Sequence, residues 1–165
     1  MPLDRALRVA TITVSDTRTD ADDEGGATLR ALLEKHAMTV SHLTVVPDDV
    51  ERIQNAITGV CDSDAADAIV TTGGTGISPR DVTYEAVEAL LEKRLDGVGE
   101  AFRRLSWDAI GPRAVLSRAV AGTYRGRIVV ALPGSPKALA LAIDTILAPI
   151  LHHAAALARG EKHGH

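Results

Sequence analysis

The chain reads Asp67-Ala-Ile-Val-Thr-Thr-Gly-Gly-Thr-Gly-Ile-Ser-Pro-Arg-Asp-Val-Thr83 near its middle, and this stretch decides the fold. Its first six residues are mostly apolar and β-branched, which is typical of a parallel strand buried on both faces. A helix is predicted to follow at residues 82–91. The three glycines between them allow positive φ angles and a close approach to a ligand, and the helix would direct free N–H groups to the same place. The stretch therefore predicts a phosphate-binding loop.

The glycine loop alone leaves two interpretations open. Glycine suits a merely tight strand-to-helix turn as well as it suits an anion site. The loop lacks the Gly-Lys-Ser/Thr ending of a Walker A motif, and Pro79 stands where the dinucleotide motif Gly-x-Gly-x-x-Gly has its third glycine. The loop therefore belongs to neither of these two nucleotide-binding classes.

Strands and helices alternate on both sides of this loop. We expect strands at residues 8–14, 39–46, 67–72, 119–124 and 127–132, and helices at 25–36, 50–60, 82–91, 98–110 and 136–159. This order predicts a three-layer α/β/α sandwich with a mostly parallel, Rossmann-like sheet, in which the last two strands form an antiparallel edge pair. Ligands of such sheets bind at the carboxyl ends of the strands.

Composition indicates one domain in the cytoplasm. At 165 residues the chain has about the length of one domain, with an expected core at residues 7–159 and a polar tail at 160–165. The single cysteine, Cys61, excludes a disulfide framework. The apolar run at 9–14 is too short for a signal peptide, and Asp144 and Pro149 interrupt the apolar run at 138–150. We therefore expect a cytoplasmic protein without a membrane span.

Charge is unevenly distributed along the chain. The formal net charge of −4 disfavours nucleic acid as a partner, and four aromatic residues are too few for a base-stacking platform. Residues 1–92 hold 7 Lys/Arg and 17 Asp/Glu, whereas residues 93–137 hold 9 and 3. The basic segment either forms solvated helix faces or supplies cations to an anionic ligand at the glycine loop.

Two aspartates at the predicted ligand edge have two possible roles. Asp48 with Glu51 fits a capping box, and Asp81 stands directly before a predicted helix, so both could be helix caps. The alternative is that the two carboxylates converge on one Mg²⁺ ion, which proteins usually hold with one or two carboxylates plus substrate phosphates. Residue chemistry leaves both roles open.

Other polar residues are predicted at the same edge. Ser15 and Asp16 follow the first strand. Ser135 and Pro136 suit the start of the last helix, whose free N–H groups, with Lys137 nearby, could instead face an anion. No serine here has a histidine beside it in sequence, so the site favours positioning and charge neutralisation over covalent catalysis.

The chain resembles the molybdopterin-binding family, which contains the molybdenum cofactor biosynthesis proteins MoaB and MogA and the G domains of plant and animal fusion proteins. The matching motifs are Thr-Thr-Gly-Gly-Thr-Gly at 71–76, Pro-Arg-Asp-Val-Thr at 79–83, Leu-Ser-Arg at 116–118 and Pro-Gly-Ser-Pro-Lys-Ala at 133–138. The resemblance covers residues 8–151. Ser-Asp-Thr-Arg at 15–18 and Leu-Ser-Arg-Ala-Val-Ala-Gly at 116–122 are closer to the MoaB branch.

The resemblance implies a reaction, the transfer of AMP from ATP to the terminal phosphate of molybdopterin with Mg²⁺ and release of pyrophosphate. It assigns Asp48 and Asp81 as catalytic residues and metal ligands. Together with the sheet edge, it points to a phosphate-binding set: Ser15, Asp16, Gly73, Gly74, Thr75, Gly76 and Ser78. It places molybdopterin at Ser106, Ser117, Gly134, Ser135, Pro136 and Lys137, with Arg118 as a further candidate.

Two other functions stay open at this point. One is a non-catalytic molybdopterin-binding or scaffolding protein of the same pathway. The other is a nucleotide-binding regulatory domain with no pterin role, since one fold hosts many functions. The resemblance also implies a homo-oligomer, either a trimer or a hexamer, and a downstream metal-insertion protein as a partner.

Overall fold

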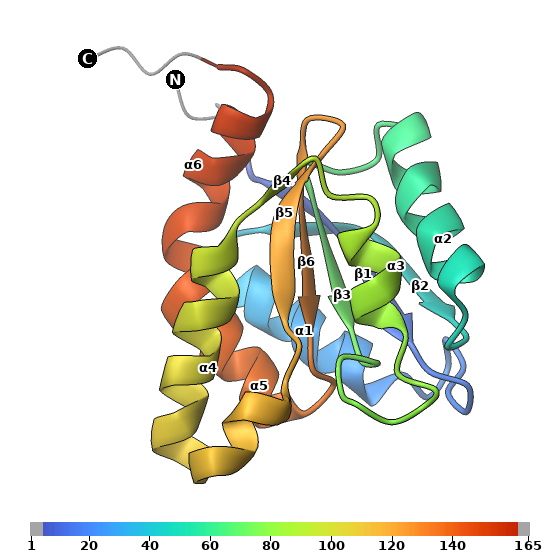
Figure 1. Cartoon of the computed structure of the whole chain (residues 1–165). Coiled ribbons are helices and arrows are strands. Elements are labelled where there is room, and N and C mark those ends of the chain that lie inside the picture. The colour runs from blue at the N-terminus through green and yellow to red at the C-terminus, as the bar shows by residue number, and fades with distance from the viewer. Residues whose placement is uncertain (1–4, 162–165) are drawn as a thin grey trace.

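One six-stranded sheet forms the centre of the computed structural model, which describes residues 5–161 (Figure 1). In spatial order its strands are β2 (Thr39–Val46), β1 (Arg8–Val14), β3 (Ala68–Thr72), β6 (Arg127–Leu132), β5 (Val120–Tyr124) and β4 (Lys93–Arg94). The first four are parallel, and β5 pairs antiparallel with both β6 and β4. The predicted α/β architecture is confirmed, and its antiparallel edge contains β4 in addition to the expected pair.

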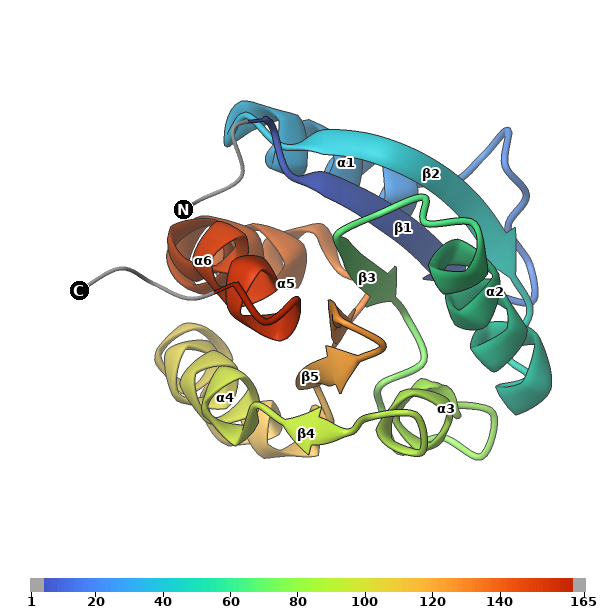
Figure 2. The same ribbon diagram turned by 90° about the horizontal axis from the view of Figure 1, so that it is seen from above.

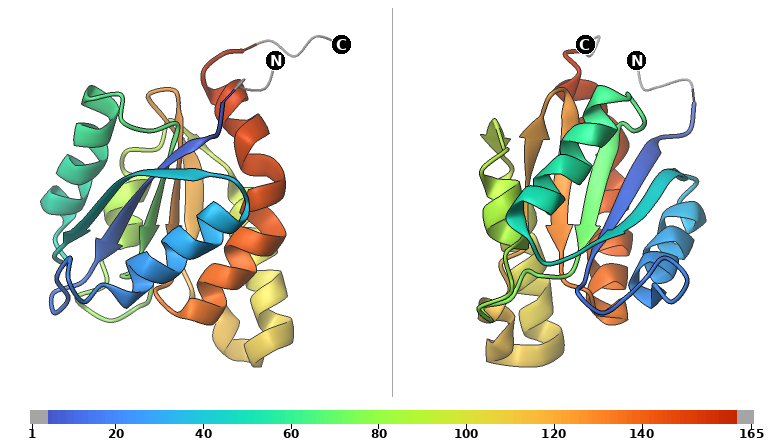
Figure 3. Two further views of the ribbon diagram at one scale, coloured as in Figure 1. Left: turned by 180° about the vertical axis from the view of Figure 1, so that it is seen from behind. Right: turned by 90° about the vertical axis from the view of Figure 1, so that its right-hand side faces the viewer.

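Helices cover both faces of this sheet (Figure 2). One face carries α1 (Glu24–Lys35), α4 (Asp96–Ile110), α5 (Pro136–Leu141) and α6 (Ala148–Ala158), and the other carries α2 (Val50–Asp62) and α3 (Thr83–Glu88). A 3₁₀ helix, η1 (Gly111–Leu116), follows α4. Every residue of β3 is buried, because helices cover the sheet on both sides. Figure 3 shows α1 beside α5 on one face of the sheet.

Of the two roles left open for the aspartates, the structure does not show helix capping. Asp49, and not Asp48, caps α2, since its Oδ1 accepts the Arg52 N–H at 2.8 Å. Helix α3 begins after Val82 without a side-chain cap, and it is shorter than the helix predicted at 82–91. Neither the Asp48 side chain nor the Asp81 side chain therefore caps the start of a helix.

The last helical stretch is continuous but changes its hydrogen-bonding pattern midway. A π-helical segment, η2 (Ala142–Leu147), joins α5 to α6. By length and composition the 23 residues Pro136–Ala158 could cross a membrane, with a mean hydropathy of 1.5. One side of the stretch packs into the core through Leu139, Ile143, Leu147, Leu151 and Ala155. That side of the stretch therefore belongs to the core of the domain, and the cytoplasmic location stays a prediction.

Asp67 connects both ends of the described chain to the start of β3 through ion pairs. Its side chain is 3% exposed and accepts hydrogen bonds from the guanidinium groups of Arg5 at 2.7 Å, Arg8 at 3.2 Å and Arg159 at 2.9 Å. The Arg8 N–H adds a further bond at 2.9 Å. These donors outweigh the effect of burial and hold the pKa of Asp67 far below its usual value. This ion cluster lies at the amino end of the parallel strands, opposite the predicted ligand edge.

Candidate functional site

The glycine loop leaves β3 through two residues that only glycine fits. Gly73 has φ 98°, and a Cβ there would lie 2.6 Å from the Val14 carbonyl oxygen. Gly74 has φ 71°, and its Cβ would collide with Thr83 Oγ1 and lie 3.3 Å from Asp48 Oδ1. The backbone therefore passes directly against the end of β1 and against the Asp48 carboxylate.

Hydrogen bonds from Arg118 hold the rest of this loop in place. Its backbone N–H donates to the Thr75 carbonyl at 3.0 Å, its Nε donates to the Gly76 carbonyl at 3.0 Å, and its Nη2 donates to the Asp81 carbonyl at 3.1 Å. The guanidinium also pairs with Glu85 at the start of α3. Arg118 was expected as a candidate contact to the ligand. The structure shows its guanidinium holding the loop in shape, and a contact to the ligand stays a prediction.

Asp81 is positioned by the turn in which it lies. Its Oδ2 accepts the Ser78 N–H at 3.0 Å, and its own N–H donates to the Ser78 carbonyl at 2.9 Å. Oδ1 has no hydrogen-bond partner among residues 5–161. Ser78 thus contributes a backbone bond that orients Asp81, and one carboxylate oxygen stays available for a ligand.

Asp48 belongs to a group of acidic side chains at the loop. The Asp16 carboxylate accepts the Asp48 N–H at 2.8 Å, which joins the segment after β1 to the segment after β2. Burial raises the pKa of Asp48, and the negative charges of Asp16 and Asp81 raise it further, while Arg80 opposes them. The backbone of Asp16 also lowers the pKa of Asp48 through a hydrogen bond, but this effect is smaller than those of burial and of the neighbouring charges. The group therefore carries negative charge that Arg80 neutralises only in part.

This donor set fits a cation that shares its ligands with a substrate. No three His, Cys, Asp or Glu side chains within residues 5–161 are arranged to hold a metal ion by themselves. Asp48 and Asp81 can supply two carboxylates, and Mg²⁺ is usually bound by one or two carboxylates with substrate phosphates completing its shell. The residues present are consistent with a site of that kind.

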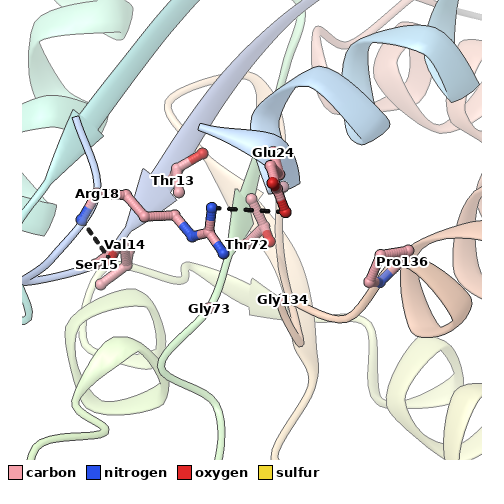
Figure 4. A pocket seen from close by; sticks show the side chains of 10 residues that line it. Thr13, Val14, Ser15, Arg18, Glu24, Thr72, Gly73, Gly134 and Pro136 are labelled. Atoms are coloured by element: carbon pink, nitrogen blue, oxygen red, sulfur yellow. Dashed lines mark hydrogen bonds and ion pairs between the residues drawn. The ribbon is translucent and has the colours of Figure 1, made fainter. Parts of the chain in front are cut away.

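A small cavity of about 160 Å³ lies at the carboxyl ends of β1 and β3, and we call it the strand-end cavity (Figure 4). Four predicted residues line it, namely Ser15, Gly73, Gly134 and Pro136. Its wall also contains residues that the sequence analysis did not propose, among them Thr72 at the end of β3 and Arg18 in the segment after β1. Arg18 appeared in the Ser-Asp-Thr-Arg motif, and its place just past a strand end was the signal that it belongs here.

A larger cavity of about 550 Å³ lies between α4 and α5, and we call it the helix cavity. Four of the residues predicted to hold molybdopterin line it together: Ser106, Ser135, Pro136 and Lys137. Much of the remaining wall is apolar, with Ala109, Ile110 and Leu141. Ser135 is also the N-cap of α5, since its Oγ accepts the Ala138 N–H at 3.2 Å. Pro136 lines both cavities, so the two adjoin.

Ser117 lies apart from the lining of both cavities. Its hydroxyl is buried and has no hydrogen-bond partner among the described residues. Its carbonyl accepts a bond from Arg103 Nη1 at 3.4 Å, which joins the end of η1 to α4. The structure thus brings most of the predicted residues to one edge of the sheet and leaves a direct role of Ser117 in binding as a prediction.

The fold and the adjoining cavities define an α/β ligand-binding domain whose site lies at the carboxyl edge of its parallel strands. Residues 10–153 match a family described as a probable molybdopterin binding domain, and the chain belongs to this family of molybdenum cofactor biosynthesis proteins. Molybdenum cofactor biosynthesis is accordingly the pathway in which the protein acts.

Known relatives agree in sequence and in structure. The molybdenum cofactor biosynthesis protein B of Staphylococcus epidermidis is 46% identical over 155 residues, which cover 92% of this chain and 88% of that one. A crystal structure of a molybdenum cofactor biosynthesis protein B is 40% identical with a TM-score of 0.91, covering 97% of this chain and 99% of its own. The tungsten cofactor synthesizing protein MoaB of Pyrococcus furiosus is 35% identical with a TM-score of 0.85, covering 93% and 98%. These matches confirm the resemblance to the MoaB branch.

Proposed function

We propose that the protein is a molybdopterin adenylyltransferase that uses ATP and Mg²⁺. The observation that carries this proposal is the Asp48 carboxylate, which lies against the glycine loop near the charges of Asp16 and Asp81. Burial and these charges raise its pKa and outweigh the opposing effects of Arg80 and of the Asp16 backbone. A protein that only held a pterin would gain nothing from unneutralised carboxylates at a phosphate-binding loop. A metal-dependent phosphoryl reaction uses such carboxylates to hold its ion.

The proposed reaction is a displacement at the α-phosphorus of ATP. An oxygen of the terminal molybdopterin phosphate attacks that phosphorus, a new P–O bond forms, and the bond to the β-phosphate oxygen breaks as pyrophosphate leaves. The protein contributes positioning, because the glycine loop presents backbone N–H groups and the helix cavity accepts a ring. Mg²⁺ held by Asp48 and Asp81 would neutralise the charge of the departing pyrophosphate.

The expected homo-oligomer also remains a proposal. Four large apolar side chains are exposed on α4 and η1: Trp107 at 50%, Ile110 at 58%, Val115 at 63% and Leu116 at 48%. Exposed large apolar side chains on two consecutive elements suit a subunit contact. Neither a trimer nor a hexamer is favoured by this surface, and the metal-insertion protein stays a predicted partner.

An adenylylation assay tests the proposed activity. Purified protein is incubated with molybdopterin, ATP and Mg²⁺, and the adenylylated pterin is separated by chromatography. We expect product with the native protein and none with Asp81→Asn, because the amide keeps the Ser78 bond but loses the charge. Saturable molybdopterin binding without any product would instead establish the scaffolding function. Tight ATP binding without pterin binding would establish a regulatory nucleotide domain.

A further inference from the structure

Thr72 places an unpaired hydroxyl in the strand-end cavity. The residue is only 1% exposed, and its Oγ1 makes no hydrogen bond to any residue in the described range. Oγ1 lies 3.8 Å from the positions that a Cβ of Gly25 and a Cβ of Gly134 would take, so it faces the space between α1 and the turn before α5. Thr13 lines the same cavity, but its hydroxyl donates to Asp23 Oδ2 at 2.7 Å. Thr72 Oγ1 is not among the hydroxyls that are sealed from solvent without a partner, so it opens into the cavity and is free to donate to a ligand there.

Arg18 adds a cation with donors to spare. Its Nη1 donates to the Asp22 carbonyl at 3.0 Å, and its Nη1 is 3.9 Å from Glu24 Oε2, which is a loose ion pair. Nε and Nη2 have no hydrogen-bond partner within residues 5–161. Figure 4 shows the guanidinium extending across the cavity toward Thr72. Arginine binds phosphate through pairs of such N–H groups.

Backbone and side-chain donors complete the same wall. Gly25 is the second residue of the twelve-residue helix α1, so its N–H has no carbonyl partner within the helix and lies at the positive end of the helix dipole. The buried Asp23 caps α1, and both of its oxygens accept bonds, from the Thr13 hydroxyl and from the Gly26 N–H. The cavity thus presents donors together with one carboxylate, Glu24, that pairs with Arg18. This chemistry suits an anion.

The sizes of the two cavities indicate that one suits a compact chemical group and the other a ring. Pockets for whole small molecules measure about 300–1,000 Å³. The helix cavity, at about 550 Å³, lies in that range, whereas the strand-end cavity, at about 160 Å³, suits a single compact group. Because Pro136 lines both, one molecule with a flat ring and a short phosphate arm can occupy the two at once.

We infer that the strand-end cavity holds the terminal phosphate of the pterin substrate, with Arg18 and Thr72 as its side-chain donors and the ring in the helix cavity. This inference rests on the proposed function, because it assumes a pterin phosphate as the substrate. It places the acceptor phosphate beside Gly73, the first residue of the glycine loop. Arg18 and Thr72 are then binding residues that select the phosphorylated form of the substrate.

The test compares two ligands that differ only in the phosphate, 6-hydroxymethylpterin and its phosphate monoester. Dissociation constants are measured by pterin fluorescence for the native protein and for the variants Arg18→Gln and Thr72→Val. Arg30→Gln is the control, because Arg30 pairs with Glu34 on the exposed side of α1. The native protein and the control should prefer the ester. Each of the other two variants should weaken ester binding by roughly ten- to a hundredfold and leave binding of the alcohol unchanged.

The outcomes separate this inference from the proposed function. A preference for the ester that survives both substitutions, or that the native protein lacks, overturns the inference even if adenylylation occurs. A preference that Arg18→Gln and Thr72→Val abolish supports the phosphate subsite even if no adenylylated product forms. Thr72→Val should keep the native unfolding midpoint, because it removes a hydroxyl that bonds to nothing in the described chain.

Discussion

Removing the charge of Asp67 should cost more stability than any other single carboxylate change at the amino end of the sheet. Asp67→Asn deletes the ion pairs with Arg5, Arg8 and Arg159 and leaves these guanidinium groups close together. Breaking a buried ion pair costs about 3–5 kcal/mol. The three arginine side chains are 46%, 30% and 25% exposed, so water replaces part of the loss, and we expect the lower limit of about 3 kcal/mol.

Urea unfolding followed by circular dichroism measures this loss, and Asp64→Asn is the matched control. Asp64 pairs with Arg8 and Arg127, but its side chain is 77% exposed, so its removal should cost less than about 1 kcal/mol. In a domain of this length, 3 kcal/mol corresponds to a melting temperature that is roughly 6–12 °C lower. Equal losses in the two variants would contradict the assignment of Asp67 as the central ion-pair residue.

The same cluster predicts how stability depends on pH. The folded-state pKa of Asp67 lies below the unfolded value of 3.8, so its contribution is fully present above pH 3.8 and is lost as the pH falls below that value. The native protein should therefore lose stability between pH 4 and pH 2 more steeply than Asp67→Asn does. Identical slopes would show that the carboxylate titrates normally and that the arginines do not hold it.

Three further predictions concern the site. Asp48→Asn should raise the urea midpoint at pH 7, because burial and neighbouring carboxylates disfavour the ionised form that the native protein carries there, and an unchanged or lower midpoint would contradict this. Gly73→Ala should lower stability by about 2 kcal/mol or more in the same assay, since φ is 98° and the added Cβ would meet the Val14 carbonyl, and a neutral effect would show that the loop can shift. Arg118→Gln should raise the KM for ATP at least roughly tenfold, because the glycine loop loses the bonds that hold it, while the affinity for the pterin ring stays unchanged. Equal losses of affinity for ATP and for the pterin would show general unfolding instead.

Much of the sheet follows from residue patterns, and its exceptions have physical causes. The strands predicted at 8–14 and 39–46 match β1 and β2 residue for residue, because β-branched runs bounded by polar turns have a clear signal. The two residues of β4 are polar and exposed, so no periodicity marks them. The π-helical segment is equally invisible, since it changes hydrogen bonding without changing composition.

The site shows where reasoning from a single sequence reaches its limit. Asp48 and Asp49 are adjacent aspartates before the same helix, and only the backbone conformation decides that Asp49 caps it. The loop-holding role of Arg118 cannot be predicted from the sequence, because its three carbonyl partners belong to residues far away in the chain. Thr72 could not be singled out in the sequence, because a threonine at the end of a buried strand needs no functional explanation. Only the structure shows that its hydroxyl has no hydrogen-bond partner among the described residues.

The neighbouring aspartates before α2 provide the most direct test of the proposed activity. Asp48→Asn and Asp49→Asn are assayed side by side for the formation of adenylylated molybdopterin from ATP. Asp49 caps the helix and should affect stability by about 1 kcal/mol or less without loss of turnover. Asp48 carries the charge at the glycine loop, so its variant should fold and form no product. Full turnover by Asp48→Asn would contradict the metal-dependent site on which the proposed function depends.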